Sequence, residues 1–235
     1  MPQKVHCIVT QVIDHSERVY SVFLKSDSPA PRFRPGQFLH LAMDPYSPGD
    51  FWPESRVFSI ASAPTERNLL RITYAVKGQF TTRMESEIQV GREVWVKLPY
   101  GEFTISPESD VCLLAGGTGI TAFTAFLAGL PTSYPRHVHL FYGARCPELL
   151  LFRFLVEETR QRCSQLHPFY MVEQSSDGPD TLPGRINLDL IWKSIPDPLA
   201  VTYYLAGPPA MLSSLTQSLK GRGVGQNQIV IDAWE

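Results

Sequence analysis

The sequence predicts a chain of two domains, in which an antiparallel β-barrel or sandwich precedes an α/β domain built on a parallel sheet. In the first part, short apolar runs are separated by proline and glycine turns, whereas in the second part apolar runs alternate with amphipathic segments. The 235 residues are 43% hydrophobic and 19% charged, which is the composition of a globular protein with a core. Because this length fits one large domain or two ordinary ones, the change of pattern decides between them.

Six strands are expected in the first part, because alternating or apolar runs are bounded there by turn residues. They cover residues 5–13, 18–25, 37–43, 57–61, 69–76 and 93–98. One helix is expected among them, over residues 81–87 after a glycine turn. This pattern is typical of an antiparallel barrel or sandwich.

The second part is expected to alternate strands with helices. The strands cover residues 111–115, 138–142, 169–172, 201–206 and 229–231, and the helices cover residues 121–130, 148–162, 188–192 and 210–220. Such alternation predicts a parallel sheet with helices on both faces. A turn-like Ser-Pro-Glu-Ser connector places the boundary near residues 104–108, which gives domains of residues 1–106 and 107–235.

Charge and cysteine usage exclude several classes of function. With 21 basic and 23 acidic residues, the net charge of −2 predicts no binding to nucleic acid. No apolar run nears the roughly 20 residues that span a bilayer, and the first residues lack the features of a signal peptide, so we expect a cytoplasmic protein without a membrane partner. The four cysteines show no C-x-x-C spacing, so no metal or iron-sulfur cluster is expected.

Two glycine loops follow predicted strands of the second part. The first is Gly116-Gly117-Thr118-Gly119, and the second is Gly207-Pro208-Pro209-Ala210-Met211. A strand that ends in glycines at the start of a helix lets a pyrophosphate approach free backbone N–H groups. Each loop has an alternative interpretation, since glycine turns also serve packing and proline is common at helix starts. Two such loops at one sheet edge favour a nucleotide site.

A cation, an aromatic ring and a hydroxyl lie close together on one predicted strand, as Arg56, Phe58 and Ser59. Alone, this strand would more often be half exposed, with its aromatic ring in the core. Six motifs, however, occur in one order along the chain: Pro35-Gly36-Gln37-Phe38, Arg56-x-Phe58-Ser59, Gly78-x-x-Thr81, Pro99-Tyr100-Gly101-Glu102-Phe103, and the two glycine loops. In this order the chain resembles the ferredoxin-NADP reductase superfamily.

The resemblance implies that the first domain is an antiparallel Greek-key β-barrel that binds flavin. Arg56 would pair with the flavin pyrophosphate, Phe58 would lie against the isoalloxazine ring, and Ser59 would hydrogen-bond near N5. Gly78 and Thr81, at a helix start, would bind the pyrophosphate and favour FAD over FMN. The alternatives are a hairpin turn for the glycine and a helix N-cap for the threonine. The resemblance adds Val57, Val76 and Phe80 to the flavin-binding set.

The resemblance also implies that a nicotinamide nucleotide lies across the second domain. Its binding set is Thr118, Gly119, Gly207, Pro208 and Met211. In the family, an acidic residue and an aromatic residue near the chain end lie by the flavin, and Asp232 and Trp234 match them. Together with Ser59 they are the predicted catalytic residues.

The choice of coenzyme depends on two charged residues. Glu173, at a strand end, would bind a ribose 2′-hydroxyl and repel a 2′-phosphate, which favours NADH. Arg145 would pair with that phosphate, so NADPH stays possible.

We therefore expect an FAD-dependent NAD(P)H oxidoreductase that passes electrons to a separate acceptor, such as a ferredoxin, a haem protein or an oxygenase component. One alternative is a reductase that uses free flavin as its substrate. A second is a non-catalytic subunit that binds flavin or nucleotide.

Overall fold

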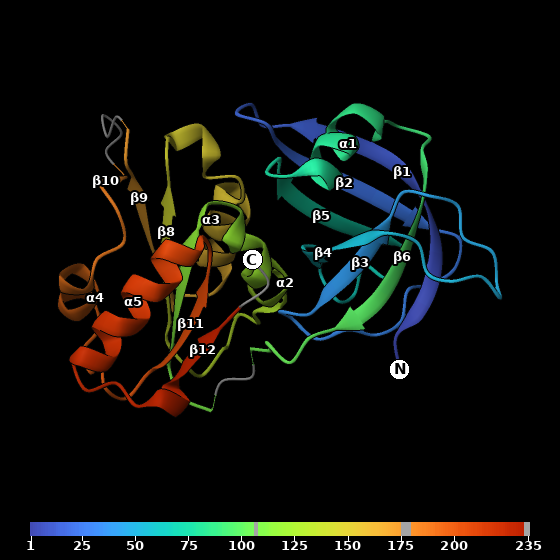
Figure 1. Ribbon diagram of the computed structural model, residues 1–235. Helices are drawn as coiled ribbons and strands as arrows, with labels where there is room; N and C mark the ends of the chain where they lie inside the picture. Colours follow the sequence, from blue (N-terminus) through green and yellow to red (C-terminus); the bar gives the residue numbers. More distant parts are fainter. Residues whose placement is uncertain (106–107, 175–179, 233–235) are drawn as a thin grey trace. The chain divides into compact units, whose positions relative to one another are not determined.

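The computed structural model describes residues 1–105, 108–174 and 180–232 (Figure 1). Contacts divide the chain into two compact units. The first comprises Met1–Thr104 with Thr124–Phe126, and the second comprises Ile105–Phe123 with Leu127–Glu235. Trp234 lies outside the described residues, so its predicted role stays a prediction.

The first unit is a nearly closed antiparallel barrel, as the sequence predicts. Its strands are β1 (Gln3–Asp14), β2 (Val19–Ser26), β3 (Phe38–Ala42), β4 (Ser55–Ser59), β5 (Leu69–Ala75) and β6 (Glu93–Tyr100). They are ordered β4-β3-β6-β1-β2-β5. The Ala61 N–H donates to the carbonyl of Arg71 over 2.8 Å, which links the end of β4 to β5, the last strand in that order.

The alternation of side chains along the strands explains this barrel. Val22 and Leu24 of β2, and Leu70 and Ile72 of β5, are fully buried and belong to one apolar cluster. Because successive residues of a strand point to opposite faces, this spacing of two places every second side chain in the core.

Helix α1 (Gln79–Glu87) covers part of that cluster with Phe80 and Met84. It begins two residues before the predicted start at Thr81. Gly78 is its N-cap residue.

The second unit is a parallel sheet with helices, which confirms the predicted fold class. Its strands are β7 (Val111–Gly116), β8 (Val138–Ala144), β9 (Leu166–Val172), β10 (Leu182–Pro183), β11 (Thr202–Ala206) and β12 (Ile229–Ile231), and the helices include α2 (Thr121–Gly129), α4 (Leu188–Ser194) and α5 (Pro209–Gly221). The sheet order is β10-β9-β8-β7-β11-β12. Helices α4 and α5 pack on one face, where their leucines join the strands in an apolar cluster (Figure 1).

The predicted helix over residues 148–162 is wrong in its first turns. A short 3-10 turn covers Pro147–Leu149, and α3 runs only over Arg153–Arg162. The reason is the buried Tyr142 of β8, whose hydroxyl donates to the Leu149 carbonyl over 3.0 Å and accepts the Leu151 N–H over 3.1 Å. These bonds tie the segment to the strand and leave only a 3-10 turn before α3 begins.

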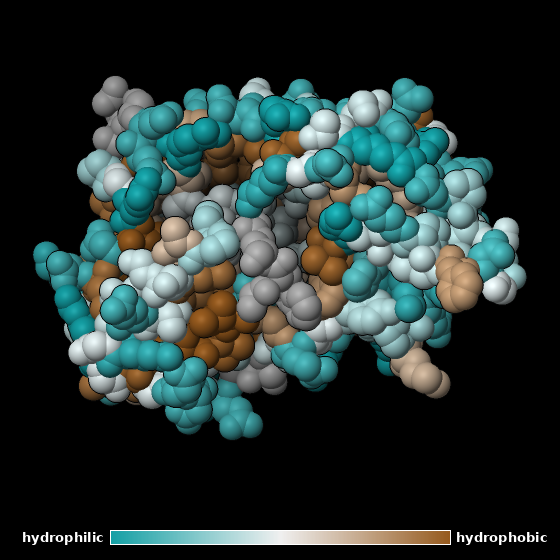
Figure 2. Space-filling model, viewed as in Figure 1, coloured by the Kyte–Doolittle hydropathy of each residue, from teal (hydrophilic) through white to brown (hydrophobic). Residues whose placement is uncertain are grey.

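Among the described residues, we find no helix with the length and apolar character required to traverse a bilayer. Figure 2 shows that hydrophilic residues make up much of the visible surface of each unit.

Candidate functional site

In the first unit, a cation from β4 lies beside the start of α1. The guanidinium carbon of Arg56 is 5.3 Å from the centre of the Phe80 ring. Phe80 is the second residue of α1, and the first N–H groups of a helix have no partner within the helix. The cation therefore lies against a side chain from the first turn of α1, and a cation together with a helix N-terminus suits a phosphate group.

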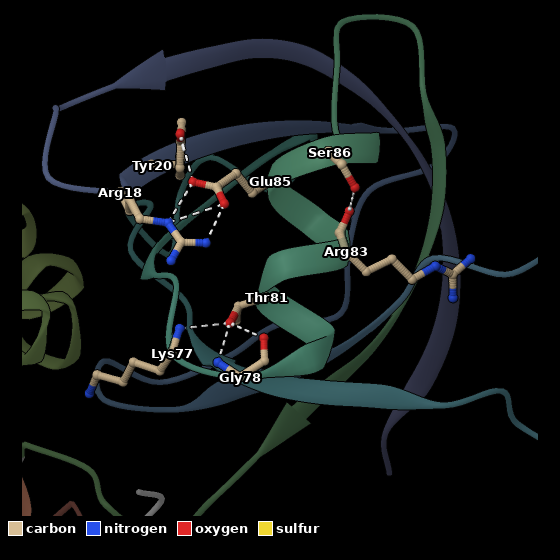
Figure 3. Close-up of polar contacts among 8 residues, drawn as sticks. All are labelled: Arg18, Tyr20, Lys77, Gly78, Thr81, Arg83, Glu85 and Ser86. Atoms are coloured by element: carbon tan, nitrogen blue, oxygen red, sulfur yellow. Dashed lines mark hydrogen bonds and ion pairs between the residues drawn. The ribbon is translucent and has the colours of Figure 1, made fainter.

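Thr81 is the third residue of α1 rather than its N-cap (Figure 3). Its hydroxyl accepts the Lys77 N–H over 2.9 Å and the Gly78 N–H over 3.1 Å, and it donates to the Gly78 carbonyl over 3.1 Å. A Cβ atom added to Gly78 would meet no atom within 4 Å, so the glycine leaves open space before the helix. The donors that remain for a phosphate at this helix are the N–H groups of the first turn.

A second set of polar contacts holds α1 to the turn between β1 and β2 (Figure 3). Glu85 accepts hydrogen bonds from Arg18, over 2.5 Å at the shortest, and from the Tyr20 hydroxyl over 3.1 Å. The hydrogen bond from Arg18 is the main cause that lowers the pKa of Glu85. This side chain therefore favours its ionised form and links α1 to Arg18 and Tyr20.

The other predicted flavin residues lie on the same part of the barrel. The ring of Phe58 is partly buried against the core, with its centre 5.9 Å from that of Tyr74. Ser59 and Val57 are partly exposed on β4, and Val76 follows β5 directly before the loop to α1. The structure thus brings Arg56, Phe58 and their neighbours to one region of the first unit.

In the second unit, the register of the parallel strands brings the predicted nicotinamide residues to one edge. Gly116 pairs with Gly143, Ala144 with Val172, Ala115 with Ala206, and Leu205 with Ile231. The segments after β7, β8, β9, β11 and β12 therefore leave the sheet side by side. Thr118 and Gly119 follow β7, Arg145 follows β8, and Glu173 follows β9. Gly207 to Met211 follow β11, and Asp232 follows β12.

The two glycine loops are packed directly against each other. A Cβ atom on Gly119 would lie 2.3 Å from the Ala206 carbonyl oxygen, and one on Gly116 would lie 2.6 Å from the sulfur of Met211. Gly207, with a φ of +153°, has the backbone of Gly116 within 3.0 Å of such an atom. The structure therefore shows the packing role of these glycines, and their role in nucleotide binding stays a prediction.

Glu173 is engaged by a residue that the sequence analysis missed. Arg185 donates from Nε to a carboxylate oxygen of Glu173 over 2.8 Å, and its terminal nitrogen lies 2.8 Å from the same oxygen. Short strand β10 pairs with β9 just before Arg185, which brings the two side chains together. No local sequence pattern predicts a contact over this separation.

Glu54 was missed as well, although a signal was present. One of its carboxylate oxygens lies 3.2 Å from a terminal nitrogen of Arg56. Glu54 directly precedes β4, and an acid two places before an arginine is close enough along the chain for the two side chains to pair.

Comparison with known proteins agrees with this architecture. Residues 113–217 match the family described as "Oxidoreductase NAD-binding domain". The reductase component of propane 2-monooxygenase from Rhodococcus jostii is 30% identical over 98% of this chain, and the chain spans 63% of the length of that relative. A zebrafish (Danio rerio) oxidoreductase NAD-binding domain-containing protein 1 is 28% identical over 96% of this chain and 90% of its own.

Solved structures share the fold of the whole chain. The Amycolatopsis cytochrome P450 reductase GcoB superposes with a TM-score of 0.84 at 22% identity, over 99% of this chain and 70% of its own. The chain thus shares with that structure a barrel followed by a unit with a parallel sheet. Over residues 113–217 it matches the oxidoreductase NAD-binding domain, in agreement with the predicted resemblance to the ferredoxin-NADP reductase superfamily.

Proposed function

We propose that this chain is an FAD-dependent NAD(P)H oxidoreductase that passes hydride from the nicotinamide to FAD and then electrons to a separate acceptor. The observation that carries the proposal is the contact between the two glycine loops at the edge of the parallel sheet. Those loops lie within the matched NAD-binding domain, where a pyrophosphate can approach the backbone.

The residues of the first unit fit a flavin with a diphosphate. Arg56 offers a forked set of donors, and α1 adds N–H groups beside it. Phe58, whose ring is partly buried and held against Tyr74, supplies a fixed aromatic surface for a planar ring. Its rigidity favours one orientation of that ring.

The chemistry of hydride acceptance belongs to the flavin when it is bound. This chain's part is to orient both nucleotides and to hold protons in place. Ser59 can donate or accept a hydrogen bond as the flavin edge changes protonation. Asp232 is fixed at the end of β12, where its N–H donates to the Leu205 carbonyl over 2.8 Å.

A separate redox protein is the proposed acceptor. The R. jostii relative is named as the reductase component of a monooxygenase, and this supports an oxygenase component ahead of a ferredoxin or another haem protein. Among the described residues, no group of three or more His, Cys, Asp or Glu side chains could hold a metal ion.

One observation favours a second candidate, a reductase that uses free flavin. Arg56, the proposed diphosphate ligand, is already paired with Glu54. An occupied ligand weakens flavin binding, which suits exchange better than permanent retention.

Two measurements test the proposal. Purified protein is analysed for bound FAD, and its flavin absorbance is followed by stopped flow after mixing with NADH or NADPH. We expect the flavin band to bleach in a single turnover, with stoichiometric FAD under the first candidate. Bleaching only when flavin is added favours the second candidate. No bleaching at saturating NADH and NADPH with added FAD would refute both and leave a binding subunit.

A further inference from the structure

Resting on the FAD site proposed above, we infer that Glu54 is an internal competitor of the flavin diphosphate, and that it lowers the affinity for FAD by occupying Arg56. The competition involves two residues of the same strand region. A carboxylate oxygen of Glu54 lies 3.2 Å from a terminal nitrogen of Arg56, and the other terminal nitrogen donates to the Ser55 carbonyl over 3.0 Å. The chain itself thus occupies part of the donor fork that a phosphate would use.

The position of this pair matters because the guanidinium also lies by α1. Its carbon is 5.3 Å from the centre of the Phe80 ring, in the first turn of the helix. A cation and a helix N-terminus form an anion site, and Glu54 supplies an anion to that cation. The carboxylate therefore pairs with one of the guanidinium nitrogens that a phosphate would use.

The pair is weak enough to be displaced. The Glu54 and Arg56 side chains are 60% and 53% exposed, and water screens such contacts. A phosphate offers more charge than a carboxylate and accepts from the same fork. FAD therefore displaces Glu54 on binding, but its affinity is reduced by the broken pair and by repulsion from the freed carboxylate.

The test compares ligands with and without phosphate. Glu54→Gln keeps the size of the side chain and removes its charge. We expect this variant to bind FAD about 1.5- to 5-fold more tightly, which is the change in affinity that corresponds to the free energy of an exposed ion pair. The affinity for riboflavin, which has no phosphate, should not change. Both are measured by quenching of flavin fluorescence at low ionic strength, where exposed charges act most strongly.

Glu93→Gln is the matched control, because Glu93 is an exposed carboxylate of the same unit, at the start of β6. It makes the same change of net charge and should leave FAD affinity at the wild-type value. Glu54→Ala repeats the test with a shorter side chain.

Several results would overturn the inference. Unchanged or weaker FAD binding in both Glu54 variants would do so, as would equal tightening for riboflavin or an equal gain in Glu93→Gln. If wild type and variants all fail to bind FAD, the proposed function fails and this inference falls with it. FAD binding that is insensitive to Glu54 would refute this inference alone.

Discussion

His139 is expected to make the second unit sensitive to acid. It lies on β8, is only 5% exposed, and its ring stacks on that of His167 with centres 5.1 Å apart. His137 adds a third imidazole, with its Nδ1 3.0 Å from the Nε2 of His167. Among the described residues, the buried Nδ1 of His139 has no hydrogen-bond partner.

Burial, followed by the neighbouring His167 and His137, lowers the pKa of His139 from 6.5 to about 4, against a smaller opposing effect of Asp110. The folded protein therefore holds this ring neutral, while the unfolded chain takes up a proton below pH 6.5. Its contribution to the free energy of unfolding is complete above pH 6.5 and is lost as the pH falls to about 4. At about 1.4 kcal/mol for each pH unit between the two pKa values, the loss is about 3 kcal/mol.

The perturbation is His139→Phe, which keeps an aromatic ring and removes the titration. Urea unfolding is measured from pH 7.5 to 4, and amide hydrogen exchange of β8 assigns the change to the second unit. We expect wild type to lose about 3 kcal/mol more than the variant over this range. Parallel losses in both proteins, or an NMR titration of His139 near pH 6.5, would refute the reasoning.

Three further predictions concern the two nucleotide sites. Gly119→Ala forces a methyl group against the Ala206 carbonyl, so NADH affinity should fall at least about tenfold by titration while FAD binding persists; unchanged NADH affinity would contradict the loop packing. Wild type should prefer NADH because the Glu173 carboxylate repels a 2′-phosphate. Arg185→Gln removes the cation that offsets this carboxylate, so kcat/KM for NADPH should fall at least about fivefold relative to that for NADH. A tenfold preference of wild type for NADPH would contradict the role of Glu173. An unchanged ratio of kcat/KM for the two coenzymes in Arg185→Gln would contradict the role of Arg185. Thr81→Val removes the acceptor of two N–H groups and should cost about 1 kcal/mol in urea unfolding; equal stability would show that water replaces it.

Much of the fold was predictable because its signals are local. The strands of both units follow from alternation or from continuous apolar runs, and the glycine loops from their place between strand and helix. The resemblance to the ferredoxin-NADP reductase superfamily was also visible in local motifs, and the comparisons with known proteins agree with it. The predicted helix bounds are wrong where a contact with another element determines the backbone. The Tyr142 hydroxyl of β8 bonds to the Leu149 carbonyl, and α3 begins only at Arg153.

The site was predictable in its residue types more than in its pairings. The carboxyl ends of parallel strands had to share an edge, so the neighbourhood of Thr118 and Glu173 followed from topology. The ion-pair partners of the charged groups could not be predicted in this way. Arg185 contacts Glu173 because β10 pairs with β9, and a strand of two residues is too short to be recognised in the sequence. The pairing of Glu54 with Arg56 had only one signal in the sequence, which is that the two residues are close along the chain. The assigned roles of the site residues stay predictions for the experiments above.

The interlocked glycine loops also restrict how this domain can be altered. Residues 116–119 and 206–211 are far apart in the chain, yet each fills the space that a side chain on the other would need. A substitution in one loop is therefore transmitted to the other, and paired changes will not be additive. Grafting one of these loops from a related protein into this chain will therefore require the other loop to be transplanted with it.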